Sequence, residues 1–184
     1  NEGATSNGTL SGSDADSDNL SFAVVGTPNR GTVTINSNGS FTYVHSGGEG
    51  ASDSFTFSIT DDSSSQLTSN IATVTITINP VNDAPVIADI SKTLDEGASA
   101  EISVSGTDAE SAILVYEIVS APSNGTFTLD SSTGLGYYTH NGSETTSDSF
   151  VVRAKESTAE VYSANATVTI TVNAVNDSPL SPDG

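Results

Sequence analysis

The sequence contains no cysteine, no methionine and no tryptophan, and only 4 of its 184 residues are lysine or arginine. Without cysteine there is no disulfide framework, no thiolate metal site and no cysteine nucleophile. There is no apolar run near the 18 residues that a membrane-spanning helix needs, and no basic cluster that would anchor the chain to a lipid surface. The sequence therefore predicts no membrane insertion.

The charge that is present has almost entirely one sign. Twenty-three Asp and Glu residues outweigh the 4 basic ones and give a formal net charge of −19 at pH 7. Such a surface repels phosphate backbones, which excludes nucleic acid as a partner. Only 34% of the residues are hydrophobic, and low hydrophobicity with high net charge is also the signature of disorder.

The placement of the apolar residues argues against disorder. Within the segment 71–78, and over residues 166–172, apolar and polar side chains alternate from Ala72 and Ala166 onward, and both segments are rich in β-branched types. Alternation with period two over seven residues is typical of a half-buried β-strand. The chain is therefore expected to fold, mostly into strands.

The sequence contains one unit twice. Val-Asn-Asp at 81–83 returns at 175–177, which is 94 residues later, and Tyr-x-His at 43–45 returns at 138–140, which is 95 residues later. Other segments agree at the same offsets, including Ser-Asp-Ser-Phe at 52–55 and 147–150. Self-similarity at one period across the whole chain indicates tandem homologous domains.

Each unit offers six or seven short strands between turn signals, such as Asn38-Gly39, which favours a hairpin. This pattern predicts an all-β fold of two tandem immunoglobulin-like Greek-key β-sandwiches, since the repeats of a β-solenoid are much shorter. The predicted domains are 1–80 and 86–175, with linkers at 81–85 and 176–184. The predicted strands are 5–10, 20–25, 31–35, 40–44, 54–60 and 71–78, followed by 86–94, 100–105, 114–119, 125–129, 136–139, 149–154 and 166–172.

The first unit is expected to lack its N-terminal strand. The second unit has the strand 86–94 before Glu96, whereas the equivalent Glu2 stands one residue after the start of the sequence. Either the sequence starts inside a repeat, or a neighbouring unit supplies the strand. An unpaired sheet edge invites pairing with another chain.

Acidic residues recur at matched positions near the predicted strand ends. Clustered carboxylates repel one another unless a cation neutralises them, and calcium prefers six to eight oxygen ligands. Neither histidine lies in the acidic runs, which argues against zinc or copper. The alternative is an acidic surface that only maintains solubility. The recurring residues are Glu2, Asp14, Asp16, Asp53, Asp61, Asn82, Asp83, Glu96, Asp108, Glu110, Asp148, Glu156, Asn176 and Asp177, and Asp18 and Asp62 extend the first unit's acidic runs.

Other chemistry finds little support. Residues 14–25 resemble the start of an EF-hand loop, but Asn19 and Val25 stand where the loop needs Gly and Glu. Nucleophile-elbow, phosphate-loop and dinucleotide motifs are absent. The recurring Tyr-x-His suggests a sugar-stacking platform or a packed strand end, of which we favour the second. The sequence therefore predicts that the chain is not an enzyme.

These motifs together resemble the cadherin-like tandem repeats, about 95 residues long, of large bacterial surface and secreted proteins. The marks of the resemblance are the linker Val-Asn-Asp-Ala-Pro at 81–85, the phrase Ser-Asp-Ser-Phe-Thr-Phe-Ser-Ile-Thr-Asp-Asp at 52–62 and the closing Thr-Val-Thr-Ile-Thr strands. The resemblance covers nearly the whole chain. It implies calcium-dependent extracellular sandwiches, joined into stalks of adhesins and biofilm proteins.

The resemblance also implies a ligand set for Ca²⁺ at the junction of two units. Asn82 would bind through its backbone carbonyl, and the set is Glu2, Asp53, Asn82, Asp83, Asp108, Glu110 and Glu156. Junctions with a preceding and a following unit would use Asp14, Asp16 and Asp61 on one side, and Glu96, Asp148, Asn176 and Asp177 on the other. Because Pro80 replaces an acidic linker residue of cadherins, one or two weakly bound ions are expected, with dissociation constants of about 10⁻⁴–10⁻³ M.

Two functions fit the sequence. In the first, the chain is a structural spacer of a bacterial cell-surface or secreted adhesin, and calcium makes its junction rigid; its partners are the neighbouring repeats. In the second, the domains themselves bind polysaccharide or a second copy in a calcium-dependent way. The exposed aromatic residues that a sugar platform needs would have to come from Tyr43, Tyr137, Tyr138 and Tyr162.

Overall fold

The computed structural model of the protein describes residues 1–178 and contains fifteen β-strands and no helix in that part. The all-β prediction is therefore confirmed. No helix in the described residues is long and apolar enough to cross a membrane. The chain divides into two compact units, Asn1–Asn82 and Asp83–Gly184, which we refer to as unit 1 and unit 2. The predicted linker 176–184 extends beyond the described residues after Ser178.

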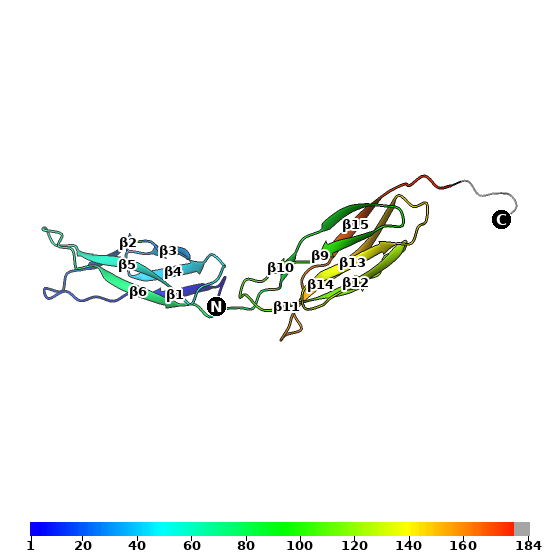
Figure 1. Ribbon diagram of the computed structural model, residues 1–184. Coiled ribbons are helices and arrows are strands. Elements are labelled where there is room, and N and C mark those ends of the chain that lie inside the picture. Colours follow the sequence, from blue (N-terminus) through cyan, green and yellow to red (C-terminus); the bar gives the residue numbers. More distant parts are fainter. Residues whose placement is uncertain (179–184) are drawn as a thin grey trace. The chain divides into compact units, whose positions relative to one another are not determined.

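Unit 1 is a sandwich of two three-stranded sheets, with strand orders β1-β4-β3 and β2-β5-β6 (Figure 1). The core lies between the sheets, where the rings of Phe41 in β4 and Phe55 in β5 meet edge to face at 5.2 Å between centroids. Its strands are β1 (Thr5–Thr9), β2 (Leu20–Gly26), β3 (Gly31–Ile35), β4 (Ser40–His45), β5 (Ser52–Asp61) and β6 (Ala72–Thr77).

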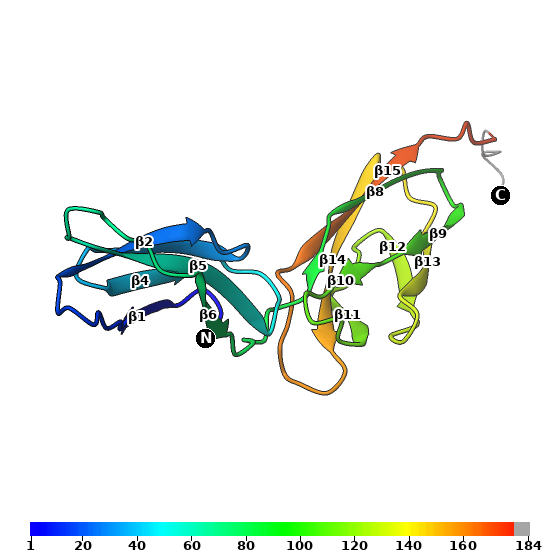
Figure 2. The same ribbon diagram turned by 90° about the vertical axis from the view of Figure 1, so that its left-hand side faces the viewer.

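Unit 2 repeats this arrangement with additional strands, in sheets of order β12-β13-β9 and β11-β14-β15-β8 and a short pair β10-β7 (Figure 2). Phe127 and Phe150 pack across the two larger sheets at 4.4 Å between ring centroids. The strands are β7 (Val86–Ile87), β8 (Ile90–Asp95), β9 (Ser99–Ser103), β10 (Gly106–Thr107), β11 (Leu114–Ser120), β12 (Gly125–Leu129), β13 (Leu135–His140), β14 (Ser147–Glu156) and β15 (Ala166–Asn173).

The predicted strands are present with ends that differ by at most two residues, apart from the segment 86–94. That segment is divided into β7, which pairs with β10, and β8, which pairs in parallel with β15. Between them, the Asp89 carboxylate accepts the N–H of Thr167 at 2.7 Å. The chain therefore changes partners at this point, which the sequence of the segment does not reveal.

The hairpin predicted at Asn38-Gly39 joins β3 and β4, which pair antiparallel. The N–H of Gly39 donates to the carbonyl of Asn36 at 2.9 Å, and Gly39 has a φ of 85°. This left-handed conformation favours glycine, because it has no Cβ to clash with the backbone. The turn chemistry read from the sequence is thus confirmed.

Candidate metal centres

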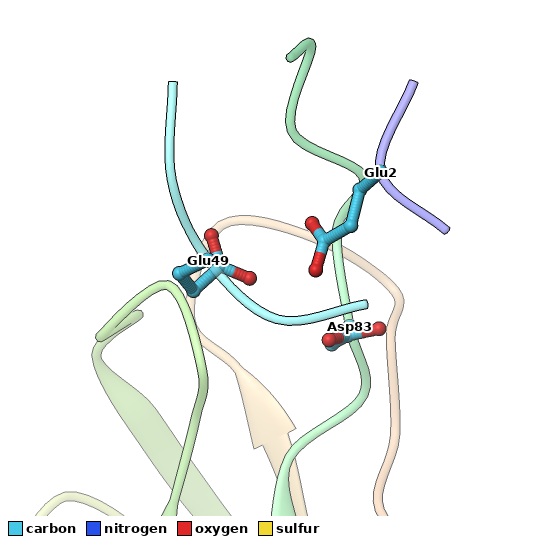
Figure 3. Close-up of side chains that lie close together, drawn as sticks. All are labelled: Glu2, Glu49 and Asp83. Atoms are coloured by element: carbon cyan, nitrogen blue, oxygen red, sulfur yellow. The ribbon is translucent and has the colours of Figure 1, made fainter. Parts of the chain in front are cut away.

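Unit 1 brings together two glutamates from loops that are far apart in the sequence. Glu2 precedes β1, and its N–H donates to the carbonyl of Asn79 at 3.0 Å. Glu49 lies in the loop between β4 and β5. The two residues offer carboxylate oxygens within 4.8 Å of each other, and Figure 3 shows their carboxyl groups turned toward one another. Figure 3 also labels Asp83, the first residue of unit 2.

Unit 2 has the same pair at the equivalent positions, Glu96 and Glu144. Here the linker residue Asp177 joins them, and oxygens of all three lie within 4.8 Å of one another. The charge of the nearby Glu96 carboxylate raises the pKa of Glu144. A hydrogen bond to Asp177 and the charge of Asp177 raise it further. The group therefore concentrates negative charge that a cation would neutralise.

A second acidic group in unit 1 consists of Asp14, Asp18 and Asp61, with oxygens within 4.8 Å of one another. The Oδ1 of Asp14 accepts the N–H groups of Asp16 at 2.8 Å and of Asp18 at 3.3 Å. Desolvation, followed by the charges of Asp14, Asp62 and Asp61, raises the pKa of Asp18. The backbone turn thus directs Asp18 into the group, whereas the predicted ligand Asp16 is not part of it.

The equivalent acidic residues of unit 2 are more dispersed. The Oδ1 of Asp108 accepts the N–H of Ala112 at 2.8 Å, and Glu110 accepts the N–H of Asp83 at 3.2 Å. Glu156, at the end of β14, is only 2% exposed. Among the described residues, these three carboxylates do not form a group as tight as the three-residue groups above.

Asp53 has a different environment from the other predicted ligands. It is 7% exposed, and its Oδ1 accepts the N–H groups of Asn29 and Ser54 at 3.0 and 2.8 Å. Its Oδ2 accepts the N–H of Arg30 at 2.9 Å and the Tyr43 hydroxyl at 2.8 Å. All four acceptor positions of this carboxylate are thus filled inside unit 1.

Asp148 repeats this network in unit 2. It accepts the N–H groups of Ser123, Asn124 and Ser149 at 2.8–3.0 Å and the Tyr138 hydroxyl at 2.9 Å. Desolvation by itself would raise the pKa of Asp148, but these donors outweigh it and the pKa lies below its ordinary value. The carboxylate therefore anchors the loop before β12 to the start of β14.

The pKa of the tyrosine in each network is shifted in the opposite direction, upward. Burial, followed by the hydrogen bond to Asp53, raises the pKa of Tyr43 to about 12. The pKa of Tyr138 is raised for the same reasons beside Asp148. The packed strand end favoured for the Tyr-x-His motif matches the burial of both tyrosines, which are 1% and 0% exposed.

The predicted linker ligands lie at exposed positions. Asn82 and Asp83 are both exposed. Asn176 and Asp177 are likewise exposed, and the side-chain amide of Asn176 donates to the carbonyl of Asp177 at 3.3 Å. Exposed side chains of this kind can change rotamer without disturbing a core, so they can adapt to an ion.

Three residues of the acidic groups were missed by sequence reasoning: Glu49 and Glu144 entirely, and Asp18 as a ligand. The signal was available, because Glu49 and Glu144 are 95 residues apart, the offset of the Tyr-x-His motifs that precede them. The matching Asp53 and Asp148 at the start of the next strand carry the same repeat signal. Sequence alone does not show that their oxygens are already occupied.

The donor set fits a hard divalent cation. Every group consists of carboxylates alone, and calcium binds oxygen ligands of this type. Three buried carboxylate oxygens, on Glu2, Glu96 and Asp108, have no hydrogen-bond partner among the residues that the structure describes. A buried charged oxygen without a partner is costly, and a bound cation would remove that cost.

Residues 1–80 match the model of the bacterial cadherin-like domain, and residues 82–173 match that of the bacterial Ig domain. Unit 1 therefore belongs to the bacterial cadherin-like domain family, as the resemblance implied, and unit 2 belongs to the bacterial Ig domain family. Domains of these families are typically extracellular and non-enzymatic, and cadherin-like domains generally bind calcium.

Several solved structures with a similar fold are cadherin repeats. Human protocadherin-24 EC1-2 is 18% identical with a TM-score of 0.53, covering 91% of this chain and 88% of that one. Human CDH23 EC21-23 is 20% identical with a TM-score of 0.51, covering 85% and 59%.

The extracellular domain of protocadherin gammaB4 is 19% identical with a TM-score of 0.53; 93% of this chain is covered. The chain spans about a third of the length of that ectodomain, 32%. At these identities the similarity establishes the fold. No curated protein matches the sequence.

Proposed function

We propose that the chain is a pair of spacer repeats of a bacterial surface or secreted adhesin, and that calcium at the junction makes the pair rigid. The observation that carries the proposal is the repetition of one acidic arrangement. Glu96, Glu144 and Asp177 form a group within unit 2. The positions of this group are repeated by Glu2, Glu49 and Asp83 at offsets of 94 and 95 residues.

The equivalence assigns Asp83 a role at the junction. In unit 2 the linker aspartate lies with the two loop glutamates, so the linker aspartate after unit 1 is expected to join Glu2 and Glu49 at the same ion. The N–H of Asp83 is held by Glu110. An ion bound by Asp83 and the unit 1 glutamates would thus be connected to unit 2 through the backbone of Asp83.

Three more of the predicted ligands complete the proposed junction site. Asn82 through its carbonyl, Asp108 and Glu156 would supply further oxygens at the junction. Asp14 and Asp61 with Asp18, and Glu96 and Asp177 with Glu144, would serve junctions with neighbouring repeats. In the absence of calcium, mutual repulsion of these carboxylates would leave the linker flexible. With calcium, the repeats would act as a stiff extender that supports cell adhesion or biofilm formation.

The carbohydrate alternative is weakened by the structure. Of the four tyrosines that could form a stacking platform, Tyr43 and Tyr138 are buried and cannot contact a sugar. Tyr137 is 51% exposed, and its hydroxyl donates to Glu101 at 3.1 Å. Because no platform of adjacent exposed rings remains among the described residues, we favour the spacer.

Thermal unfolding of the full chain in 5 mM calcium and in EDTA tests the proposal. A ligand that binds only the folded state raises stability by mass action. For a dissociation constant of about 10⁻⁴–10⁻³ M the gain is about 1–2 kcal/mol per site, or on the order of 5–15 °C in Tm. Glu49→Gln should remove most of the gain of unit 1, whereas Glu101→Gln, an equal change of charge on β9, should keep it. An identical Tm in calcium and EDTA would contradict the proposal.

A further inference from the structure

The recurring histidines, which the proposed function does not use, occupy one arrangement in both units. His45 ends β4 and is 4% exposed, and His140 ends β13 and is 3% exposed. The backbone N–H of His45 donates to the carbonyl of Ala4, two residues after Glu2, at 3.1 Å. The backbone N–H of His140 donates to the carbonyl of Ala98, two residues after Glu96, at 3.0 Å. Each histidine is thus held beside the loop that carries Glu2 or Glu96.

In unit 1, one ring nitrogen accepts two backbone hydrogen bonds. The Nδ1 of His45 accepts the N–H of Gly3 at 3.0 Å and that of Gly47 at 3.3 Å. Gly3 directly follows Glu2, and Gly47 precedes Glu49 by two residues. A single side-chain atom therefore connects the two loops that carry the glutamate pair.

Unit 2 has the same connection. The Nδ1 of His140 accepts the N–H of Gly97 at 3.2 Å and that of Gly142 at 3.3 Å. Gly97 follows Glu96, and Gly142 precedes Glu144 by two residues. The arrangement recurs although the loops differ in sequence, Ser-Gly-Gly at 46–48 against Asn-Gly-Ser at 141–143.

The backbone at all four donors is specialised for this contact. Gly3, Gly97, Gly47 and Gly142 have φ values of 66°, 68°, 78° and 78°. A residue with a side chain rarely adopts this conformation. Glycine at these positions lets both loops direct their N–H groups at one acceptor. The two loops and the ring are therefore joined by hydrogen bonds to a single atom.

The hydrogen bonds also define the state of the ring. Because both partners of Nδ1 are N–H donors, Nδ1 carries no proton, and the neutral ring carries its proton on Nε2. In unit 2 this Nε2 lies 3.1 Å from the hydroxyl oxygen of Thr145, the residue after Glu144. The ring of His140 thus contacts the glutamate loop at two points.

We propose that His45 and His140 are positioning residues for the cation sites: each neutral imidazole joins two glycine loops and holds their glutamates together before an ion arrives. The proposal rests on the proposed calcium function and names the element that organises each site. Two carboxylates within 4.8 Å repel each other, so without a connection the loops would separate. Holding them together in advance lowers the cost of ordering them on binding.

The test is a calcium chloride titration of the full chain, followed at the backbone amides of each site by NMR. His140→Leu keeps an apolar side chain in the pocket but removes the acceptor, and should weaken binding at Glu96 and Glu144 roughly ten- to a hundredfold. The Glu2 and Glu49 signals in the same sample should titrate as in the wild type. His45→Leu should show the reverse pattern.

A rescue variant separates positioning from general destabilisation. The side-chain oxygen of Asn is as many bonds from Cα as Nδ1 of His, so His140→Asn should restore most of the affinity that His140→Leu loses. Phe127→Leu, in the core of unit 2, should lower stability and leave calcium affinity unchanged. Equal calcium affinities of the wild type and His140→Leu would overturn this inference but not the proposed function.

A measurement on the calcium-free wild type guards against a variant that does not fold. In EDTA, the ¹⁵N shifts of both rings should report the Nε2–H form, and the amides of Gly97 and Gly142 should exchange slowly with solvent. Rapid exchange or the Nδ1–H form would overturn the inference. If the wild type bound no calcium at either site, the proposed function would fail, and the positioning role with it.

Discussion

β6 of unit 1 and β15 of unit 2 have the same alternation of apolar residues and threonines, but they are buried to different depths. Val168 and Ile170 of β15 are 0% exposed, whereas their counterparts Val74 and Ile76 in β6 are half-buried. Both strands pair with the equivalent neighbour on one side, β5 or β14. The difference therefore lies on the other side.

In unit 2 that side is covered by β8, which pairs in parallel with β15 from Ile90 to Asp95. Leu94 of β8 belongs to the buried core. No strand among the described residues pairs with the equivalent edge of β6. Alternation thus predicts which face of a strand points inward, but the depth of burial depends on a neighbour that the strand's own sequence does not contain.

The largest expected difference between the units follows from this edge. Ile170→Ala should cost about 3–5 kcal/mol, because the side chain is fully enclosed, whereas Ile76→Ala should cost about 1–2 kcal/mol. Native-state hydrogen exchange of the full chain, resolved by residue, reads the stability of each unit separately. Equal losses would show that the open edge has no energetic consequence.

A smaller effect, equal in both units, is expected from the buried tyrosine hydroxyls. Tyr43→Phe and Tyr138→Phe each remove one hydrogen bond to a carboxylate, which is worth about 1.5–2 kcal/mol. Because the donors around Asp53 and Asp148 are the same in kind, the two losses should agree. The same exchange experiment measures them, and a clearly larger loss in unit 2 would mean that the edge difference extends to this network.

The smallest of the expected effects, again in the same direction in both units, appears in acid. The folded-state pKa values of Asp53 and Asp148 lie below the ordinary 3.8. The unfolded chain therefore takes up protons first as the pH falls. Both groups contribute stability that is fully present above about pH 4 and is lost as the pH falls below it, through the folded-state pKa.

Urea unfolding at pH 7 and at pH 3 measures this loss. Asp148→Asn should be less stable than the wild type at pH 7, but it should lose less on acidification, because the ionisable group is gone. Asp53→Asn should behave in the same way for unit 1. A variant that lost as much stability as the wild type between the two pH values would show that other carboxyl groups dominate.

The fold could be predicted because its signals are local. Residues 71–78 and 166–172 carry the strand pattern on their own, and Asn38-Gly39 defines a hairpin through its backbone chemistry. The repeat offset then gave the number of units. The change of partner at Asp89 escaped prediction, because it depends on which sheet each half of the segment joins.

The candidate sites were less accessible to sequence reasoning. Spacing showed that Glu2 and Glu96 recur, but it did not separate Glu49 from Asp53, which both lie next to the start of β5. The oxygens of Asp53 are filled by backbone donors and a tyrosine from other segments. Such occupancy is a property of three-dimensional packing, as is the ring of His45 between two glycine loops.

The most direct test of the central claim is ¹⁵N relaxation of the full chain in 5 mM calcium and in EDTA, which gives a rotational correlation time for each unit. The account predicts that the two units tumble as one body in calcium and with separate, shorter correlation times in EDTA. Asp83→Asn should keep the EDTA behaviour in calcium. Correlation times that do not respond to calcium would contradict the calcium-stiffened spacer.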